Sequence, residues 1–477
     1  MELYLATPVF AAILAVALIA GMHRVLMLVA VTIPFGMLAA IGLPAVGGLS
    51  VLATSVAAAA LVGVGCLALL SALVRGAAIR VEPASLAIGL YAAYAVFSAT
   101  VLVRLFAGES MVFSLSRNAA GVKVSTLFSW GKVWLAPSNT NISQTFYVVL
   151  ACGFFIVAVQ VLSRHGTALG GRAMAAAAAI NIVLGVMDLA ALDPILNVVR
   201  TASYSLSNEA TVNGIPRVIG GYSEAASFGT ACAMFFAYFA SSFVDTGRPR
   251  DGLLALGNGA FAALALSATG IIALGAVCCV LAVKTIGRIP ARVQPGQLVA
   301  AAIGILVLTV IVSAVLTLTP APEVIAAVID DLILNKSQSA SGYERKAWAI
   351  GGLDALIDTW GLGAGTGSRR SNGLVFVLLG SVGIVGTAAF ALFLGLAFGG
   401  KAVAGQAAAL SSARLGALAV LVSMTLTATV PDPTVPLILL AAIAVSARRP
   451  QPLTAPGIAA RQIGDDDTGS GLQAVHQ

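Results

Sequence analysis

Long apolar runs separated by short polar connections recur along the whole chain. Runs of about 17 to 25 residues match the length of a helix that crosses a bilayer. They are too long and too evenly apolar for the alternating strands of a membrane barrel, and lipid offers no partner for an unpaired backbone. We predict thirteen membrane-spanning helices, at residues 4–22, 25–43, 49–73, 84–106, 144–162, 173–192, 224–244, 252–267, 270–286, 297–319, 372–398, 414–430 and 433–446.

Composition supports this class, because 59% of the residues are hydrophobic and only 9% are charged. The chain is therefore expected to be an all-α polytopic membrane protein with one integral domain, residues 1–447. The tail 448–477 is rich in Pro, Gly and Asp and is predicted to be disordered and cytoplasmic.

The first apolar run lacks a preceding basic segment and a cleavage site, so we interpret it as a retained helix. The five cysteines lie within apolar runs and are expected to pack there.

Basic residues occupy every second connection, which indicates the orientation, because Lys and Arg remain on the cytoplasmic side. They are Arg24, Arg75, Arg80, Arg164, Arg172, Arg248, Arg250, Lys284, Arg288, Arg292, Lys401, Arg414, Arg448 and Arg449. This pattern predicts an outer N-terminus and a cytoplasmic C-terminus. The net charge of +7 reflects mainly these connections, which favours contact with membrane lipid over nucleic acid.

Three long connections fall on the predicted outer face, at 107–143, 193–223 and 320–371. Long loops held by short-looped helices commonly carry functional sites. In the second, Arg217 and Glu224 flank a Gly-Gly pair that permits a sharp bend. Glu224 is then a candidate for chemistry at the membrane surface. The alternative is that Glu224 pairs with Arg217 and only stabilises the start of the next helix.

The third connection contains a predicted amphipathic helix at 343–360, with Arg345 at the border of its faces. One face carries Ile350, Leu353, Leu356, Ile357 and Trp360, and the opposite face carries Glu344, Asp354 and Asp358. A helix that only caps the bundle would show the same pattern. The glycine-rich stretch that follows lacks the ending and the βαβ context of a nucleotide-binding loop. We interpret it as a flexible loop that presents Arg369 and Arg370, whose planar donors suit a diphosphate.

These residues resemble the bacterial O-antigen polymerase and O-antigen ligase superfamily. The resemblance covers about residues 210–400, including Arg217 to Gly229 and the LALSATGIIAL segment at 264–274. Its central pattern is Ser341-Gly342, Arg345, Trp348, residues 361–367, Asn372, and Gly383 to Gly386. The ligase branch typically has a His directly before the residue matching Asn372, where this chain has Ser371. That departure favours the polymerase branch.

The resemblance implies a polysaccharide polymerase of the bacterial inner membrane. Its substrate would be an undecaprenyl-diphosphate-linked oligosaccharide, joined to the next lipid-linked repeat unit at the outer face. A chain-length regulator or export proteins would be its partners. An O-antigen ligase-type transferase and a lipid-linked sugar transporter remain alternatives, although no clear internal repeat supports the transporter.

The residues can support transfer from a diphosphate, since pre-placed cations stabilise the leaving group. Arg217 and Arg345 are candidate catalytic cations, and Glu224 is the candidate base, with Asp354 behind it. The candidate substrate contacts are Arg369, Arg370, Tyr222, Trp348, Asn372 and Asp354. The outer connections have no DxD cluster, so we predict a reaction that needs neither a metal nor another cofactor.

Overall fold

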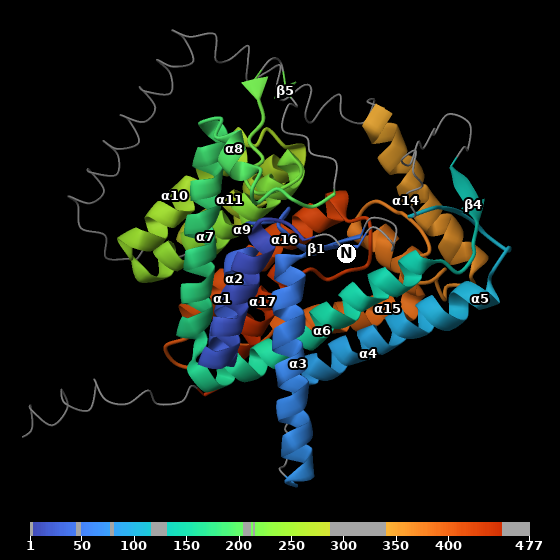
Figure 1. Cartoon of the computed structure of the whole chain (residues 1–477), viewed down its shortest axis with the longest axis horizontal. Helices are drawn as coiled ribbons and strands as arrows, with labels where there is room; N and C mark the ends of the chain where they lie inside the picture. The colour runs from blue at the N-terminus through green and yellow to red at the C-terminus, as the bar shows by residue number, and fades with distance from the viewer. Residues whose placement is uncertain are drawn as a thin grey trace, which may run out of the picture.

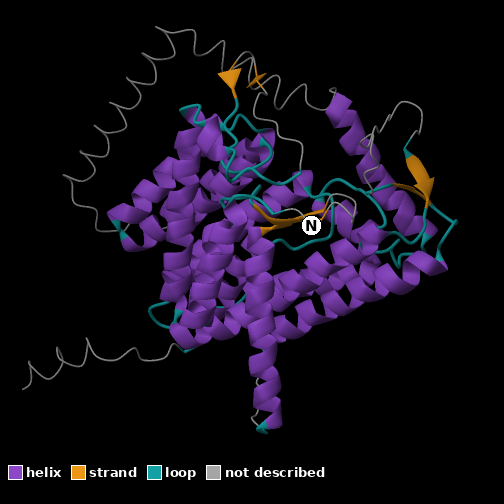
Figure 2. Ribbon diagram, viewed as in Figure 1, coloured by secondary structure: helices purple, strands orange, loops and turns teal. Residues whose placement is uncertain are grey.

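The computed structural model describes most of the chain as a bundle of helices with short strand pairs in the connections (Figures 1 and 2). The described residues are 3–43, 49–76, 81–115, 131–203, 211–212, 215–286 and 340–450. Within them, eight helices are long and apolar enough to cross a membrane, which supports the helical membrane class. The predicted span 297–319, residues 320–339 of the loop 320–371 and the tail beyond 450 lie outside the described residues.

The N-terminal part contains the clearest departure from the predicted spans. Helices α1 (Ala6–Ala20) and α2 (Met22–Thr32) are short, and β1 (Ala39–Leu43) pairs antiparallel with β2 (Leu49–Leu52). The prediction of a continuous helix over 25–43 is therefore wrong beyond Thr32. Pro34 and Gly36 end the helix inside an apolar run, because proline lacks an amide donor and restricts the residue before it.

The next helices are long. They are α3 (Ala53–Val74), α4 (Pro83–Phe97), α6 (Asn139–His165) and α7 (Thr167–Leu189). Helix α4 continues through the π-helical turn η2 (Ser98–Leu102) into α5 (Val103–Leu105). The strands β3 (Met111–Phe113) and β4 (Lys132–Trp134) form an antiparallel pair in the first long connection. Helix α3 projects below the rest of the bundle in Figure 1, and its lower half exposes apolar side chains such as Leu67 and Leu70.

After α7, the second long connection contains α8 (Asp193–Leu196) and the pair β5 (Thr211–Val212) and β6 (Ile215–Pro216). Helices α9 (Ala225–Thr246), α10 (Pro249–Leu264) and α11 (Ala268–Ile286) follow. The predicted division between residues 252–267 and 270–286 is confirmed. It falls at Leu266, whose φ of 44° is incompatible with a continuing helix.

The last part begins with α14 (Ala340–Asp358), which corresponds to the predicted amphipathic helix. It is followed by α15 (Leu374–Phe398), α16 (Ala407–Thr427) and α17 (Val435–Ser446). Helix α17 is too short to span a bilayer alone, but Leu437 to Ala444 are fully buried. The count of thirteen spans thus remains a prediction.

The basic connections meet at one end of the bundle. Lys284 at the end of α11 pairs with Asp245 at the end of α9 at 2.8 Å. The rings of His23 and His165 lie 4.8 Å apart, which joins the α1–α2 and α6–α7 turns. Arg449, after α17, pairs with Glu82 before α4. This gathering agrees with the predicted alternation of basic connections, while the compartment that this end faces remains a prediction.

Candidate functional site

A cavity of about 570 Å³ opens at the other end of the bundle. Its polar lining includes Tyr222 and Glu224 from the second long connection and Arg370 from the third. Asp432 joins them from the short connection between α16 and α17. Apolar side chains of α9 and α16, among them Met234 and Met424, form another part of the wall. Two of the three predicted outer connections thus contribute to one cavity that is partly polar and partly apolar.

The segment before α9 is anchored by a buried ion pair that the sequence analysis did not single out. Arg200 pairs with Asp188 at the end of α7, and Arg200 Nε donates to the Gly220 carbonyl oxygen at 2.9 Å. Asp188 also accepts the amides of Ile219 and Gly220, at 2.7 and 3.1 Å. Gly220 has a φ of 55°, which glycine adopts without strain. The predicted bend is present, and these bonds fix it.

Tyr222 is held rigidly on the cavity wall. Its hydroxyl donates to the Ile33 carbonyl oxygen at 3.0 Å, which connects the segment before α9 to the end of α2. Its ring lies against Gly36, where any Cβ would be 2.4 Å from the Tyr222 Cδ1 atom. The glycine that helps to end α2 is therefore also required for the position of Tyr222.

Glu224 occupies the position immediately before α9, as the sequence predicts, and its side chain is exposed. Its carboxylate caps no backbone amide, and it accepts a hydrogen bond from Ser227 Oγ at 3.4 Å. Burial lowers the pKa of Arg217, and the nearby Glu224 carboxylate opposes that shift. The two side chains form no ion pair in the described structure, so Glu224 remains available to the cavity.

The glycine-rich segment is packed and hydrogen-bonded, so the expectation of a flexible loop was wrong. Residues 363–369 are buried, and the amides of Ala364 and Gly365 donate to the carbonyls of Gly380 and Ser381. These bonds are possible because Gly383 interrupts α15 with a φ of 62°. The positive φ angles belong to Gly361, Gly363, Gly365 and Gly367. The repeated glycines therefore allow the positive φ angles that this tightly packed segment needs where it lies against the kinked helix α15.

Arg369 is buried between α14 and α15 rather than presented to the cavity. It is 1% exposed, and none of its guanidinium nitrogens has a hydrogen-bond partner among the described residues. Burial lowers the pKa of Arg369 to about 10, against the opposing charge of Asp354. The guanidinium thus stays protonated at neutral pH. A buried cation without a hydrogen-bond partner is costly, and such groups are commonly retained for function.

Arg370 is the arginine that reaches the cavity. Its guanidinium carbon lies 4.6 Å from the centre of the Trp348 ring, in cation–π contact, and its backbone amide donates to Phe113. Trp348 therefore acts from α14 as a platform for Arg370. The sequence grouped Trp348 and Arg370 as substrate contacts, and the structure brings the two together.

Ser371 and Asn372 fasten this segment to two helices. Ser371 Oγ donates to the Trp348 carbonyl oxygen at 3.1 Å. Asn372 Nδ2 donates to the Leu426 carbonyl oxygen at 3.1 Å, near the end of α16. Asn372 is thus engaged in positioning the chain beside the cavity, and a direct contact between Asn372 and substrate stays a prediction.

Arg345 and Asp354 lie on α14, and neither of them lines this cavity. Arg217 does not line it either, and its Nε donates to the Ala265 carbonyl oxygen at 3.5 Å. Asp354 lies 3.5 Å from Lys132 and lines a separate hollow with Asp358 and Glu109. The apolar side chains predicted for one face of α14 point outward, with Ile357 72% and Trp360 80% exposed. Gly351, Gly352 and Ala355 instead pack against the bundle. The exposed apolar stripe suits contact with lipid.

Asp432 was missed by sequence reasoning. Its carboxylate accepts the amide of Thr434 at 3.0 Å, and burial raises its pKa while that hydrogen bond opposes the shift. Thr434 has a φ of 62°, a strained value for a β-branched residue. The signal in the sequence is a single acidic residue between two prolines in a connection otherwise flanked by apolar runs.

The cavity therefore combines two carboxylates, Glu224 and Asp432, with the guanidinium of Arg370. Such a set can bind an anionic group through the arginine and accept a proton through a carboxylate. The apolar part of the wall can accommodate a lipid chain. Compared with protein-family models, curated proteins and solved structures, the chain shows no significant match.

Proposed function

We propose that the chain is a membrane glycosyltransferase that elongates a polysaccharide from lipid-diphosphate-linked repeat units. The observation that carries the proposal is the shared cavity of Glu224, Arg370 and Asp432, which has an apolar wall beside its charged groups. A lipid-linked sugar diphosphate has the same two-part character. Its diphosphate needs cations, and its polyprenyl chain needs an apolar surface.

In this proposal Arg370 binds the diphosphate of the donor, and Trp348 keeps its guanidinium oriented. As the bond between sugar and phosphate breaks, negative charge develops on the diphosphate, and a fixed guanidinium stabilises that charge. The buried charge of Arg369, the neighbouring residue, adds to the positive potential. Arg217 and Arg345 remain candidate cations for other positions of the substrate.

A carboxylate accepts the proton of the attacking sugar hydroxyl. Glu224 is exposed at the cavity, and Asp432 is the second candidate because its raised pKa makes it a stronger base than an ordinary Asp. We assign the reaction to the outer face of a bacterial inner membrane, since the cavity lies at the end opposite the basic connections. The resemblance to the O-antigen polymerase and ligase superfamily favours a polymerase, because Ser371 stands where the ligase branch typically has His.

The proposal is tested by replacing the cavity residues in cells that make the polymer. Glu224→Gln, Arg370→Ala and Asp432→Asn are compared by the length distribution of the glycan and by the amount of protein in the membrane. The matched control is Glu109→Gln, since Glu109 is an exposed carboxylate outside this cavity. Shortened glycan in Arg370→Ala and in at least one carboxylate variant, at normal protein levels, is expected. Full-length glycan in all three variants would refute the assignment of the site.

A further inference from the structure

A second cavity, of about 410 Å³, lies at the basic end of the bundle, opposite the candidate catalytic cavity. Three helices begin at its wall: α7 at Thr167, α10 at Pro249 and α16 at Ala407. None of these starts is capped by a side-chain hydrogen bond. The first amides of a helix lack internal partners and carry partial positive charge, so the three starts together favour an anion.

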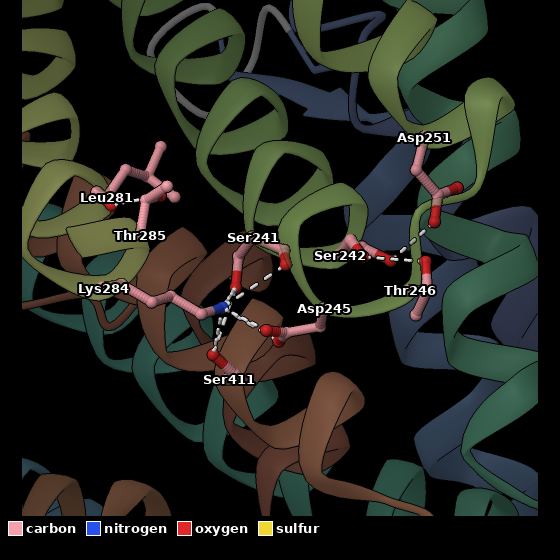
Figure 3. Close-up of polar contacts among 9 residues, drawn as sticks. All are labelled: Ser241, Ser242, Asp245, Thr246, Asp251, Leu281, Lys284, Thr285 and Ser411. Carbon is pink, nitrogen blue, oxygen red and sulfur yellow. Dashed lines mark hydrogen bonds and ion pairs between the residues drawn. The ribbon is translucent and has the colours of Figure 1, made fainter. Parts of the chain in front are cut away.

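Three arginines add full charges to this cavity. Arg172, Arg248 and Arg250 line it, and none of them forms an ion pair in the described part of the chain. The one carboxylate in the lining, Asp251, accepts a hydrogen bond from Ser242 Oγ at 2.6 Å (Figure 3). Three arginines and one aspartate leave a formal charge of +2 on the lining, which favours an anion there.

A buried hydroxyl on the same wall lacks a partner. Ser412 is 1% exposed and lines the cavity, and its Oγ atom has no hydrogen bond within the described residues. The preceding residue, Ser411, serves a different network, in which its hydroxyl receives a hydrogen bond from Lys284 at 2.7 Å (Figure 3). An unpaired buried hydroxyl costs free energy, and an oxygen of a ligand in the cavity would satisfy it.

We propose that this cavity binds a phosphate group. The helix starts and arginines supply donors and positive charge around a single concave site, which suits a tetrahedral anion, and Ser412 supplies a further hydrogen bond. The volume exceeds that of phosphate alone and leaves room for a polar substituent. The phosphate belongs either to a lipid headgroup or to a soluble molecule. The site is independent of the proposed transferase reaction, since it shares no lining residue with the catalytic cavity.

The experiment compares two variants of the full chain that lose equal charge at exposed arginines. The test variant is Arg172→Gln, Arg248→Gln, Arg250→Gln. The control variant is Arg24→Gln, Arg75→Gln, Arg164→Gln, whose arginines are also exposed and lie outside the cavity. Purified proteins are titrated with phosphatidylglycerol and followed by native mass spectrometry. In a separate arm without added lipid, they are titrated with inorganic phosphate and pyrophosphate and followed by thermal shift.

The test variant is expected to bind at least one probe more than about tenfold more weakly than the wild type, whereas the control variant keeps wild-type affinity. Loss confined to phosphatidylglycerol identifies a lipid headgroup as the source, and loss confined to the soluble anions identifies a soluble phosphate. Ser412→Ala, which removes one hydroxyl, should weaken the same probe roughly three- to tenfold. Equal weakening in the test and control variants, or no binding of any probe by the wild type, would overturn the proposal.

Discussion

The guanidinium of Arg369 fills the space where a side chain at Gly380 would be. A Cβ at position 380 would lie 1.4 Å from Arg369 Nη1, and one at Gly352 on α14 would lie 3.2 Å from Nη2. Arg369 is therefore enclosed in a slot between two helices whose facing residues are glycines. No described residue accepts a hydrogen bond from this guanidinium, so the slot holds a buried cation at an energetic cost.

The slot predicts a strong effect of one methyl group. Gly380→Ala should displace Arg369 or separate α14 from α15, and overpacking of this kind costs about 1–3 kcal/mol. Gly395→Ala is the matched control, since Gly395 lies on the same helix with nothing within 4 Å of the added methyl group. Thermal unfolding of the purified proteins should show a lower Tm only for Gly380→Ala. Equal values of Tm for both variants would mean that Arg369 is not confined as described.

A second prediction separates stability from function at Arg369. Arg369→Met keeps an unbranched side chain of similar length and removes the buried charge, so Tm should be unchanged or higher. If the charge of Arg369 supports the leaving group, glycan elongation should nevertheless fall by at least about tenfold, measured at equal amounts of protein. Normal elongation in Arg369→Met would show that the charge of Arg369 does not support the leaving group.

The sequence predicted the helical membrane class, the bend before α9 and the helix of residues 343–360, because hydrophobic spacing and Gly-Gly pairs act locally. It did not predict that Arg369 would be buried while Arg370 reaches the cavity. Adjacent side chains diverge according to the backbone of the glycine-rich segment, which depends on contacts with the kinked α15. The contribution of Asp432 also depended on tertiary structure, since its connection approaches Glu224 only when α9 and α16 pack together.

The raised pKa of Asp432 leads to a prediction about pH. A carboxyl whose pKa is higher in the folded than in the unfolded state favours folding when it is protonated, and this stabilisation is lost as the pH rises through its folded pKa. Above that folded pKa, the charged Asp432 therefore destabilises the fold. The gain in Tm on Asp432→Asn should therefore be larger at alkaline than at acidic pH, by on the order of 1–2 °C. A gain that shrinks as the pH rises would contradict the direction of this shift.

The contact between Arg370 and Trp348 predicts that charge alone does not suffice. Arg370→Lys keeps the charge but loses the planar guanidinium that stacks on the ring and can bind two phosphate oxygens at once. Elongation should be intermediate between the wild type and Arg370→Ala. Trp348→Leu should resemble Arg370→Lys, since it leaves the arginine without its platform. The rates are measured with the same amount of membrane protein. Wild-type rates in Arg370→Lys and Trp348→Leu would show that stacking of Arg370 on Trp348 does not contribute to elongation.

The most direct test of the proposed function uses purified protein in a lipid environment with lipid-diphosphate-linked repeat units as the only substrate. The buffer contains a chelator and no nucleotide, because the donor already carries its leaving group and arginines replace the metal in this account. Glycan length on the lipid carrier is read by gel electrophoresis or mass spectrometry. The account predicts longer lipid-linked glycans with the wild type and shortened products with Arg370→Ala. Unchanged glycan length with the wild type would contradict a polymerase and favour a transporter, and product that appears only after a separate acceptor lipid is added would indicate a ligase.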